Sequence, residues 1–245
     1  MKLYAVTASL AVGLAMLPEM ASAQVRGTGG VSYGNGEDLG IEGGLTIPAG
    51  GSLTFLVDAD WDQGDGDTFD TFDTYSAVGH LIARNSERAW GGFVGVSRAD
   101  IDFDDIDTWT VGGEYARFLP NYTLAGRLSY SSVDDADVDI WGLSGEYRLF
   151  ANDNLRFDFG AGWSVIDGGV SDDDAITLAG GAEYRFANSP ISLGARLGWV
   201  NSDDEDETSV GVTLRFDFGN RSLKDRDRRG NTFGAVSSMI SEILP

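Results

Sequence analysis

The sequence predicts an all-β protein: a transmembrane, antiparallel, up-and-down β-barrel of about twelve strands with short periplasmic turns and acidic extracellular loops. Three observations predict this fold class. Apolar and polar residues alternate with a period of two along most of the chain after residue 23, turn signals separate the alternating segments, and the connections are short and long in turn. Such alternation is typical of strands with one apolar face, and such connections are typical of membrane-spanning barrels.

Residues 1–23 have the features of a signal peptide and are excluded from the fold. Lys2 gives a basic start, residues 3–17 form an apolar run, and residues 21–23 form a small-residue cleavage site. We therefore expect an exported mature chain that begins at Gln24. A second apolar run long enough for a transmembrane helix is absent from the sequence.

Residues 24–219 carry the alternation and form the predicted barrel. In residues 51–61, for example, Leu53, Phe55 and Val57 share one face, while Thr54 and Asp58 share the other. About eleven residues rising roughly 3.3 Å each at a tilt near 40° cover about 27 Å, which matches the apolar band of an outer-membrane barrel. The expected strands are residues 25–34, 38–47, 51–61, 74–84, 88–98, 107–118, 121–132, 138–149, 155–165, 175–186, 191–201 and 208–218.

The two ends of the predicted barrel differ chemically. Short turns lie at residues 48–50, 85–87, 120, 151–154 and 188–190, and acidic connections lie at residues 62–73, 100–107, 134–137, 167–174 and 203–207. Aromatic residues are expected to form a girdle at each membrane interface. Toward the acidic connections these are Trp61, Tyr75, Trp109, Tyr130, Trp141, Trp163 and Trp199, and toward the short turns Tyr115, Tyr122, Tyr147, Phe157, Tyr184, Phe216 and Phe218. A soluble β-sandwich is the alternative, but it does not require banded aromatic residues.

Composition excludes several classes of function. The chain has 17 Lys and Arg against 39 Asp and Glu, a net charge of −22, which disfavours nucleic-acid binding. It has no cysteine and one histidine, His80, so thiolate and multi-histidine metal sites are excluded. We expect His80 to be a lumen residue hydrogen-bonded to the wall, and we predict no enzyme activity and no cofactor.

No metal site is predicted. Residues 58–62 resemble the opening of a calcium loop, but Gln63 and Phe69 replace the glycine and glutamate that an EF-hand requires. Weak binding of divalent cations by acidic loop residues remains an alternative.

A belt of alternating acidic and basic residues is expected on the lumen wall near the short turns. Neighbouring strands lie about 4.8 Å apart, so opposite charges on them can pair. Two interpretations stay open: a structural belt that fixes register, which we favour, and a charged constriction that passing solutes sense. The belt comprises Glu114, Arg127, Glu146, Arg156, Glu183 and Arg196.

An acidic mouth is expected at the opposite end. A ring of carboxylates raises the local concentration of cations and repels anions, although solvated loops bridged to lipopolysaccharide by divalent ions are an equal alternative. The mouth comprises Asp65, Asp67, Asp104, Asp105, Asp134, Asp135, Asp172, Asp173, Asp203, Asp204 and Glu205.

Residues 220–245 form a predicted basic and amphipathic periplasmic tail. Its basic run consists of Arg221, Lys224, Arg226, Arg228 and Arg229, and Phe233, Val236, Ile240 and Ile243 follow at helical spacing. The tail has three alternatives: it lies on the periplasmic leaflet, enters the lumen, or stays disordered. Its short apolar stripe favours weak docking on the leaflet.

Repeated short motifs resemble the hairpin units of porin-like outer-membrane β-barrels of Gram-negative bacteria. They are residues 113–115, 145–147 and 182–184, and the twin segments 155–159 and 214–218. The last strand, with Phe216 and Phe218, is similar to the aromatic-ended strand that such proteins present to the insertion machinery, although here the chain continues beyond it.

The resemblance implies an outer-membrane channel for passive diffusion of small hydrophilic solutes, and the acidic mouth adds a cation preference. The alternative is a closed structural or surface-interaction barrel of the opacity type, whose acidic loops bind divalent ions, lipopolysaccharide or host surfaces. The expected partners are outer-membrane lipid, lipopolysaccharide and the insertion machinery. The sequence does not predict an oligomeric state.

Overall fold

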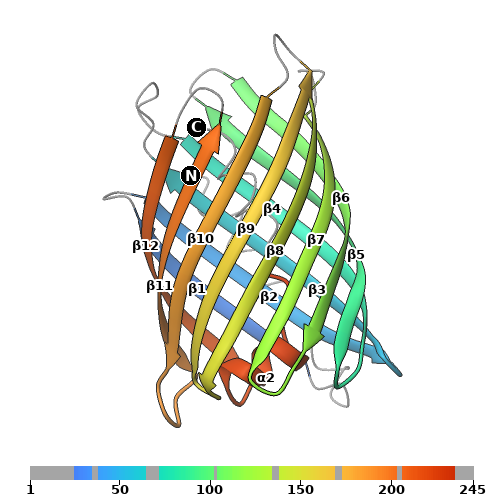
Figure 1. Ribbon diagram of the computed structural model, residues 1–245, viewed down its shortest axis with the longest axis vertical. Helices are drawn as coiled ribbons and strands as arrows, with labels where there is room; N and C mark the ends of the chain where they lie inside the picture. Colours follow the sequence, from blue (N-terminus) through green and yellow to red (C-terminus); the bar gives the residue numbers. More distant parts are fainter. Residues whose placement is uncertain are drawn as a thin grey trace, which may run out of the picture.

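The computed structural model describes residues 25–34, 38–64, 72–101, 104–133, 138–168, 173–202 and 206–234. Within these ranges twelve antiparallel strands close into one barrel, because the first strand pairs with the last from Gly27 opposite Phe218 to Gly34 opposite Gly211 (Figure 1). The predicted fold class is therefore confirmed. No helix in the described ranges is long and apolar enough to cross a membrane.

The strands follow one another around the barrel in sequence order, and one short helix comes after them. They are β1 (Arg26–Gly34), β2 (Asp38–Gly50), β3 (Leu53–Gly64), β4 (Phe72–Arg84), β5 (Arg88–Ile101), β6 (Asp104–Phe118), β7 (Tyr122–Val133), β8 (Val138–Asn152), β9 (Leu155–Gly168), β10 (Asp173–Arg185), β11 (Ile191–Ser202) and β12 (Asp206–Phe218), followed by helix α2 (Leu223–Arg229). The turns after β2, β4, β6, β8 and β10 lie at one end, called here the short-turn end, and the other is the acidic-loop end.

The strands extend further toward the acidic-loop end than the alternation predicted. β5, for example, ends at Ile101 and not at residue 98. Polar cross-strand pairs continue the ladder there: Arg98 lies opposite Asp107 and donates from Nε and Nη2 to its two carboxylate oxygens at 2.6 and 2.5 Å. Beyond the apolar band a strand needs no apolar face, so hydropathy alone misplaces these ends.

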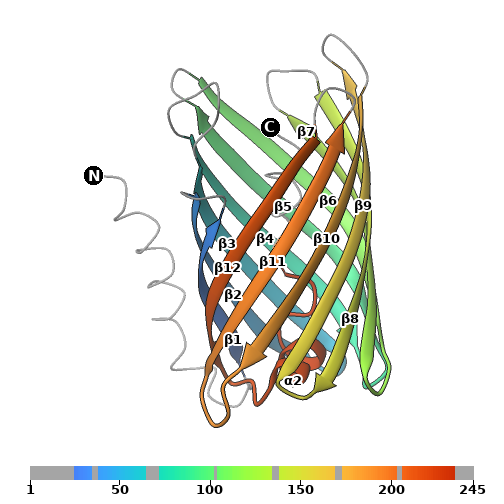
Figure 2. The ribbon, with the colours of Figure 1, turned by 60° about the vertical axis from the view of Figure 1, so that its left-hand side comes forward.

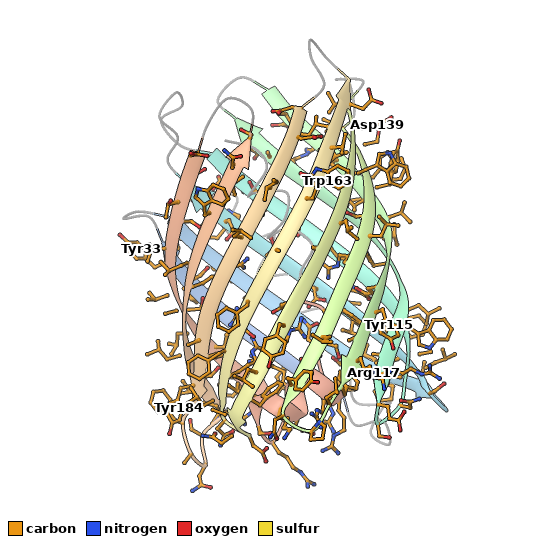
Figure 3. The ribbon with its side chains drawn as sticks, in the orientation of Figure 1. Tyr33, Tyr115, Arg117, Asp139, Trp163 and Tyr184 are labelled. Carbon is orange, nitrogen blue, oxygen red and sulfur yellow. The ribbon has the colours of Figure 1, made fainter. Side chains whose placement is uncertain are left out.

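Large apolar and aromatic residues cover the outside of the barrel. Trp163 lies toward the acidic-loop end, and Tyr115 and Tyr184 lie toward the short-turn end (Figure 3). The rings of Trp109 and Tyr130 are 5.3 Å apart, and those of Tyr130 and Trp141 are 5.0 Å apart, so three neighbouring strands share one aromatic cluster. This arrangement agrees with two interfacial girdles.

The inside of the barrel differs on its two sides, which the sequence did not predict. On β3–β6 the inward positions carry large apolar side chains, among them Leu56, Ile82, Phe93 and Phe118, all less than a tenth exposed. The alternation of apolar and polar residues predicts a small and polar face opposite the apolar outer face, and this prediction is wrong for these strands. It holds on β7–β12, where glycine, alanine, serine and threonine share the inner face with charged residues. We call these the packed side and the hollow side.

Residues 220–234 lie inside the barrel, where α2 occupies the short-turn end (Figure 1 and Figure 2). Leu223, Arg226 and Asp227 are buried, and Phe233 belongs to the same buried apolar cluster as Leu56 and Ile82 of the wall. The favoured prediction of docking on the periplasmic leaflet is wrong for this segment, because the wall offers both charge partners and an apolar pocket. Residues 1–23, predicted as a signal peptide, and residues 235–245 lie outside the described ranges.

Candidate functional site

Two of the predicted belt pairs between neighbouring strands are formed. Glu114 lies directly opposite Arg127, with Oε2 3.6 Å from Nη2. Glu183 lies opposite Arg156, with Oε2 3.4 Å from Nη2. In both pairs the hairpin register sets the two charged residues side by side, as cross-strand pairing predicts.

The belt is nevertheless discontinuous. Glu146 lies opposite Ala125 and not opposite Arg127, because the register of β7 and β8 offsets the two charges. It pairs instead with Arg148, two residues along its own strand, at 2.5 Å. Arg196 lies opposite Gly181 and Gly211 and faces the open part of the lumen. The wall charges therefore form separate clusters and not a ring.

The first cluster is centred on His80, which is 2% exposed. Its Nδ1 lies 2.9 Å from Glu114 Oε1, and its Nε2 lies 3.3 Å from Asp58 Oδ2. The expectation of a lumen histidine hydrogen-bonded to the wall is confirmed. The sequence analysis missed that two carboxylates flank the ring, although Asp58, His80 and Glu114 share the inward parity. These contacts join residues that are not directly opposite each other in the strand ladders. They depend on the stagger of three hairpins, whereas the alternation predicts only which residues point into the lumen.

The second cluster is centred on Glu183, also 2% exposed. One carboxylate oxygen, Oε2, lies 3.4 Å from Arg156, 3.5 Å from Arg215 and in close contact with Arg226 of α2. The other oxygen accepts a hydrogen bond from Ser192 Oγ at 2.5 Å. Three guanidinium groups thus balance one buried carboxylate, with further acceptors supplied by neighbouring acids.

The third cluster is centred on Arg148 and joins the wall to residues 220–234. Arg148 Nη1 lies 2.7 Å from Asp227 Oδ1 and donates to the carbonyl of Thr232 at 2.5 Å. Thr123 Oγ1 donates to Asp227 Oδ2 at 2.7 Å. Asp227 is therefore held by two neighbouring strands, β7 and β8.

A cavity of about 250 Å³ lies along the hollow side. This volume is far above the roughly 15 Å³ that one water molecule needs. Glycines on β9–β11 widen the cavity at their positions because they carry no side chain, and Phe233 forms part of the lining from the inside. The charged residues that line the cavity are Arg127, Arg148, Arg156, Arg196, Arg215, Glu146, Asp158 and Glu183. Such a surface offers hydrogen-bond donors and acceptors to water and to small hydrophilic solutes.

Most of the predicted acidic mouth lies outside the described ranges: Asp65, Asp67, Asp134, Asp135, Asp172, Asp203, Asp204 and Glu205. Asp104 begins β6, Asp173 begins β10, and the carboxylate of Asp105 lies 3.6 Å from Arg98 Nη1. Among the residues that the structure describes, no group of three or more His, Asp or Glu side chains is placed to hold a metal ion.

Comparison with known proteins identifies relatives of the fold. No protein-family model matches the chain, and no curated protein matches it. The COG4313 outer membrane channel from Pseudomonas putida F1 is similar in structure, with a TM-score of 0.62 and 12% identity over 80% of this chain and 95% of that chain. The KdgM porin, solved in complex with disordered oligogalacturonate, has a TM-score of 0.51 and 13% identity over 79% of this chain and 99% of that chain. The chain has the fold of outer-membrane β-barrel proteins.

Proposed function

We propose that the protein is a porin-like channel of the outer membrane that lets small hydrophilic solutes diffuse passively, with a preference for cations. The observation that carries this proposal is the cavity of about 250 Å³ on the hollow side, inside a closed barrel with an apolar outer face. Charged and small residues line it, so a solute entering it exchanges hydrogen bonds with water for hydrogen bonds with the wall.

The proposed cation preference arises at the acidic-loop end. Deeper in the lumen, five arginines and three carboxylates line the cavity, so the cavity wall is not the source of this preference. The chain has a net charge of −22, and many of its acidic residues lie in the connections at the acidic-loop end. Fixed carboxylates at a pore entrance raise the local cation concentration.

We propose transport and not catalysis because the one histidine is inaccessible. His80 is 2% exposed and both of its ring nitrogens face wall carboxylates, so a substrate in the cavity does not reach it. A general base must lie within hydrogen-bond reach of the proton that it removes.

The proposed location is the outer membrane, reached after cleavage of residues 1–23. The apolar outer face would contact lipid and lipopolysaccharide, and the last strand, β12, would be presented to the insertion machinery. Divalent cations would bridge the acidic loops to lipopolysaccharide. N-terminal sequencing of the mature protein from an outer-membrane fraction tests this: we expect Gln24 first, and recovery as soluble periplasmic protein would contradict the location.

A closed structural or surface-interaction barrel is the second candidate, and one observation favours it. Residues 220–234 occupy the short-turn end, and the packed side fills part of the remaining lumen. In this case the acidic loops, and not the lumen, would carry the function.

Swelling of proteoliposomes separates the two candidates. Vesicles containing the refolded protein are diluted into isotonic solutions of neutral sugars of increasing size, with protein-free vesicles as the control. We expect fast swelling for the smallest solutes and a steep decline with size, since the lumen is narrowed by its own side chains. Swelling no faster than the control for every solute would favour the closed barrel.

A further inference from the structure

Residues 220–234 cross the lumen at the short-turn end and contact the wall on several sides. Asp225 pairs with Arg26 of β1 at 2.7 Å, Arg226 pairs with Asp217 of β12 at 3.3 Å, and Asn231 Nδ2 donates to Asp58 of β3 at 2.5 Å. Arg84 of β4 and Arg127 of β7 donate to the carbonyls of Gly230 and Phe233 at 3.0 and 2.9 Å. Because these partners lie around the barrel, the segment spans its cross-section.

The contacts that hold this segment are mainly polar. Apart from Leu223 and Phe233, its buried side chains are charged or hydrogen-bonding, and their partners on the wall are too. Burying paired charges stabilises a contact little, because desolvation offsets most of the attraction. On separation, both surfaces regain water. An interface of this kind separates at a much lower cost than an apolar core of the same size.

The strand ladders of the barrel do not include the segment. All twelve strand pairs, including β1 with β12, are formed between wall strands, and within the described ranges residues 220–234 join none of these ladders. Their backbone link to the wall is a hydrogen bond from Lys224 N–H to the carbonyl of Asp153 at 3.2 Å, in the turn between β8 and β9. The segment can therefore leave without opening the sheet.

The chain also has a pivot where the segment begins. Gly219 has φ +75, a conformation that L side chains rarely adopt, and a Cβ there would lie 2.8 Å from the carbonyl oxygen of Val25. This glycine allows the chain to leave β12 and turn back into the lumen. Rotation at one residue would swing the segment toward the periplasmic side.

We propose that residues 220–234 form a displaceable plug, which narrows the short-turn end of the lumen to a low-conductance path when docked and widens it when it swings out about Gly219. This proposal rests on the proposed channel function and adds a gate to it. Phe233 is its apolar stopper, in one buried cluster with Leu56 and Ile82 of the packed side. The charge pairs of Asp225, Arg226 and Asp227 hold it in register with the wall.

A reversible cross-link tests the plug in the full chain. The protein has no cysteine, so Asp153→Cys with Lys224→Cys introduces a single pair, whose backbones already share a hydrogen bond and lie within reach of a disulfide. We expect a low, steady conductance in planar bilayers when the pair is oxidised. After addition of a reductant, openings to a level several-fold higher should appear.

The matched control is Asn85→Cys with Arg88→Cys, which cross-links the turn between β4 and β5 and leaves the plug free. Its conductance should not respond to reductant. Equal conductance of the oxidised and reduced plug variant would overturn the plug and leave the channel standing. Absence of conductance from the wild type and from the reduced plug variant would overturn the channel, and the plug with it.

A second set of variants gives an independent reading. Phe233→Ala removes the stopper and Asp227→Asn removes a charge that Arg148 and Thr123 hold, so each should increase the fraction of time spent in the higher conductance level several-fold. Arg221→Ala, at an exposed position of the same segment, is the control and should leave this fraction unchanged. Unchanged gating in both anchor variants would contradict the plug.

Discussion

At the scale of single residues, His80, Glu183 and Arg148, the centres of the three charge clusters, each contact more than one polar partner. Glu114 is buried between His80 and Arg127, and Arg127 itself lies 5.1 Å from the ring centre of Phe93 and donates to the carbonyl of Phe233. A buried charge that loses its partner is strongly destabilising, whereas replacing both partners costs less. Because of this difference, the contribution of an individual pair to stability can be measured with single and double variants.

Removing Arg127 should destabilise the barrel through Glu114. We expect Arg127→Ala to lower the free energy of unfolding by about 1–3 kcal/mol, because Glu114 loses its guanidinium partner and keeps the contact with His80. Urea unfolding in lipid vesicles, followed by tryptophan fluorescence, measures the change. In the double variant with Glu114→Gln the loss should be less than the sum of the single losses. Strict additivity would show that the two residues do not interact.

The sequence predicts which charged residues point into the lumen, but it predicts their ion-pair partners only in part. The in-register pairs Glu114 with Arg127 and Glu183 with Arg156 follow from hairpin alternation. Partners that lie across several strands depend on the stagger of the closed barrel. Glu146 and Arg148 lie two residues apart on one face of β8, so the alternation allows this pair, but an expectation of partners on neighbouring strands missed it.

At the scale of elements, the strands were predictable because each is a local pattern, whereas the placement of residues 220–234 was not. The segment has a visible basic run, but its binding surface exists only after twelve strands have closed and gathered Glu183, Asp217 and the apolar positions of the packed side. Ser222 begins α2 by accepting a hydrogen bond from the N–H of Asp225 at 3.0 Å, an N-cap that helical spacing from Phe233 onward did not indicate.

The connection between β12 and α2 should be sensitive to side-chain size. We expect Gly219→Val to destabilise docking of the plug by about 1–3 kcal/mol, because the residue must keep a left-handed φ and its Cβ would contact Val25. Limited proteolysis of the refolded protein should then release the tail faster. Gly79→Ala is the control, since its Cβ meets open space, and it should leave the rate unchanged. Equal rates for both variants would contradict the role of Gly219.

Docking of the plug should weaken in acid. Burial acts to raise the pKa of the Asp225 carboxyl, but the Arg221 N–H and the Arg26 guanidinium outweigh it, so the pKa lies below its ordinary value. Because the pKa is lowered, the contribution of Asp225 to the free energy of docking is complete at pH values above the ordinary carboxyl pKa of about 4. This contribution is lost as the pH falls through the pKa that Asp225 has in the docked segment.

Protection of the tail against an acid-active protease measures this effect. We expect protection to be constant from neutral pH to about pH 4 and to decrease below it. Asp225→Asn should reduce protection at neutral pH and flatten this part of the profile. An unchanged profile in the variant would show that Asp225 does not contribute.

At the scale of the whole molecule, the barrel combines a packed side, a hollow side and two chemically different ends. The apolar side chains of β3–β6 and residues 220–234 narrow the lumen, so the proposed solute path is the cavity along the glycine-rich wall of β7–β12. The barrel fold and the number of its strands follow from the sequence pattern. The width of the path does not, because it depends on which inward side chains meet across the barrel.

The salt dependence of ion selectivity tests the account most directly. Refolded full-length protein in planar bilayers under a KCl gradient should conduct, with a reversal potential of cation-preferring sign. The preference should shrink as the salt rises from about 0.1 M to about 1 M, where the Debye length falls from about 10 Å to about 3 Å. Replacing the acids at residues 203–207 by amides should reduce it, whereas Glu87→Gln at the short-turn end should not. Anion preference, or no conductance from protein that resists unheated detergent and is therefore folded, would contradict the account.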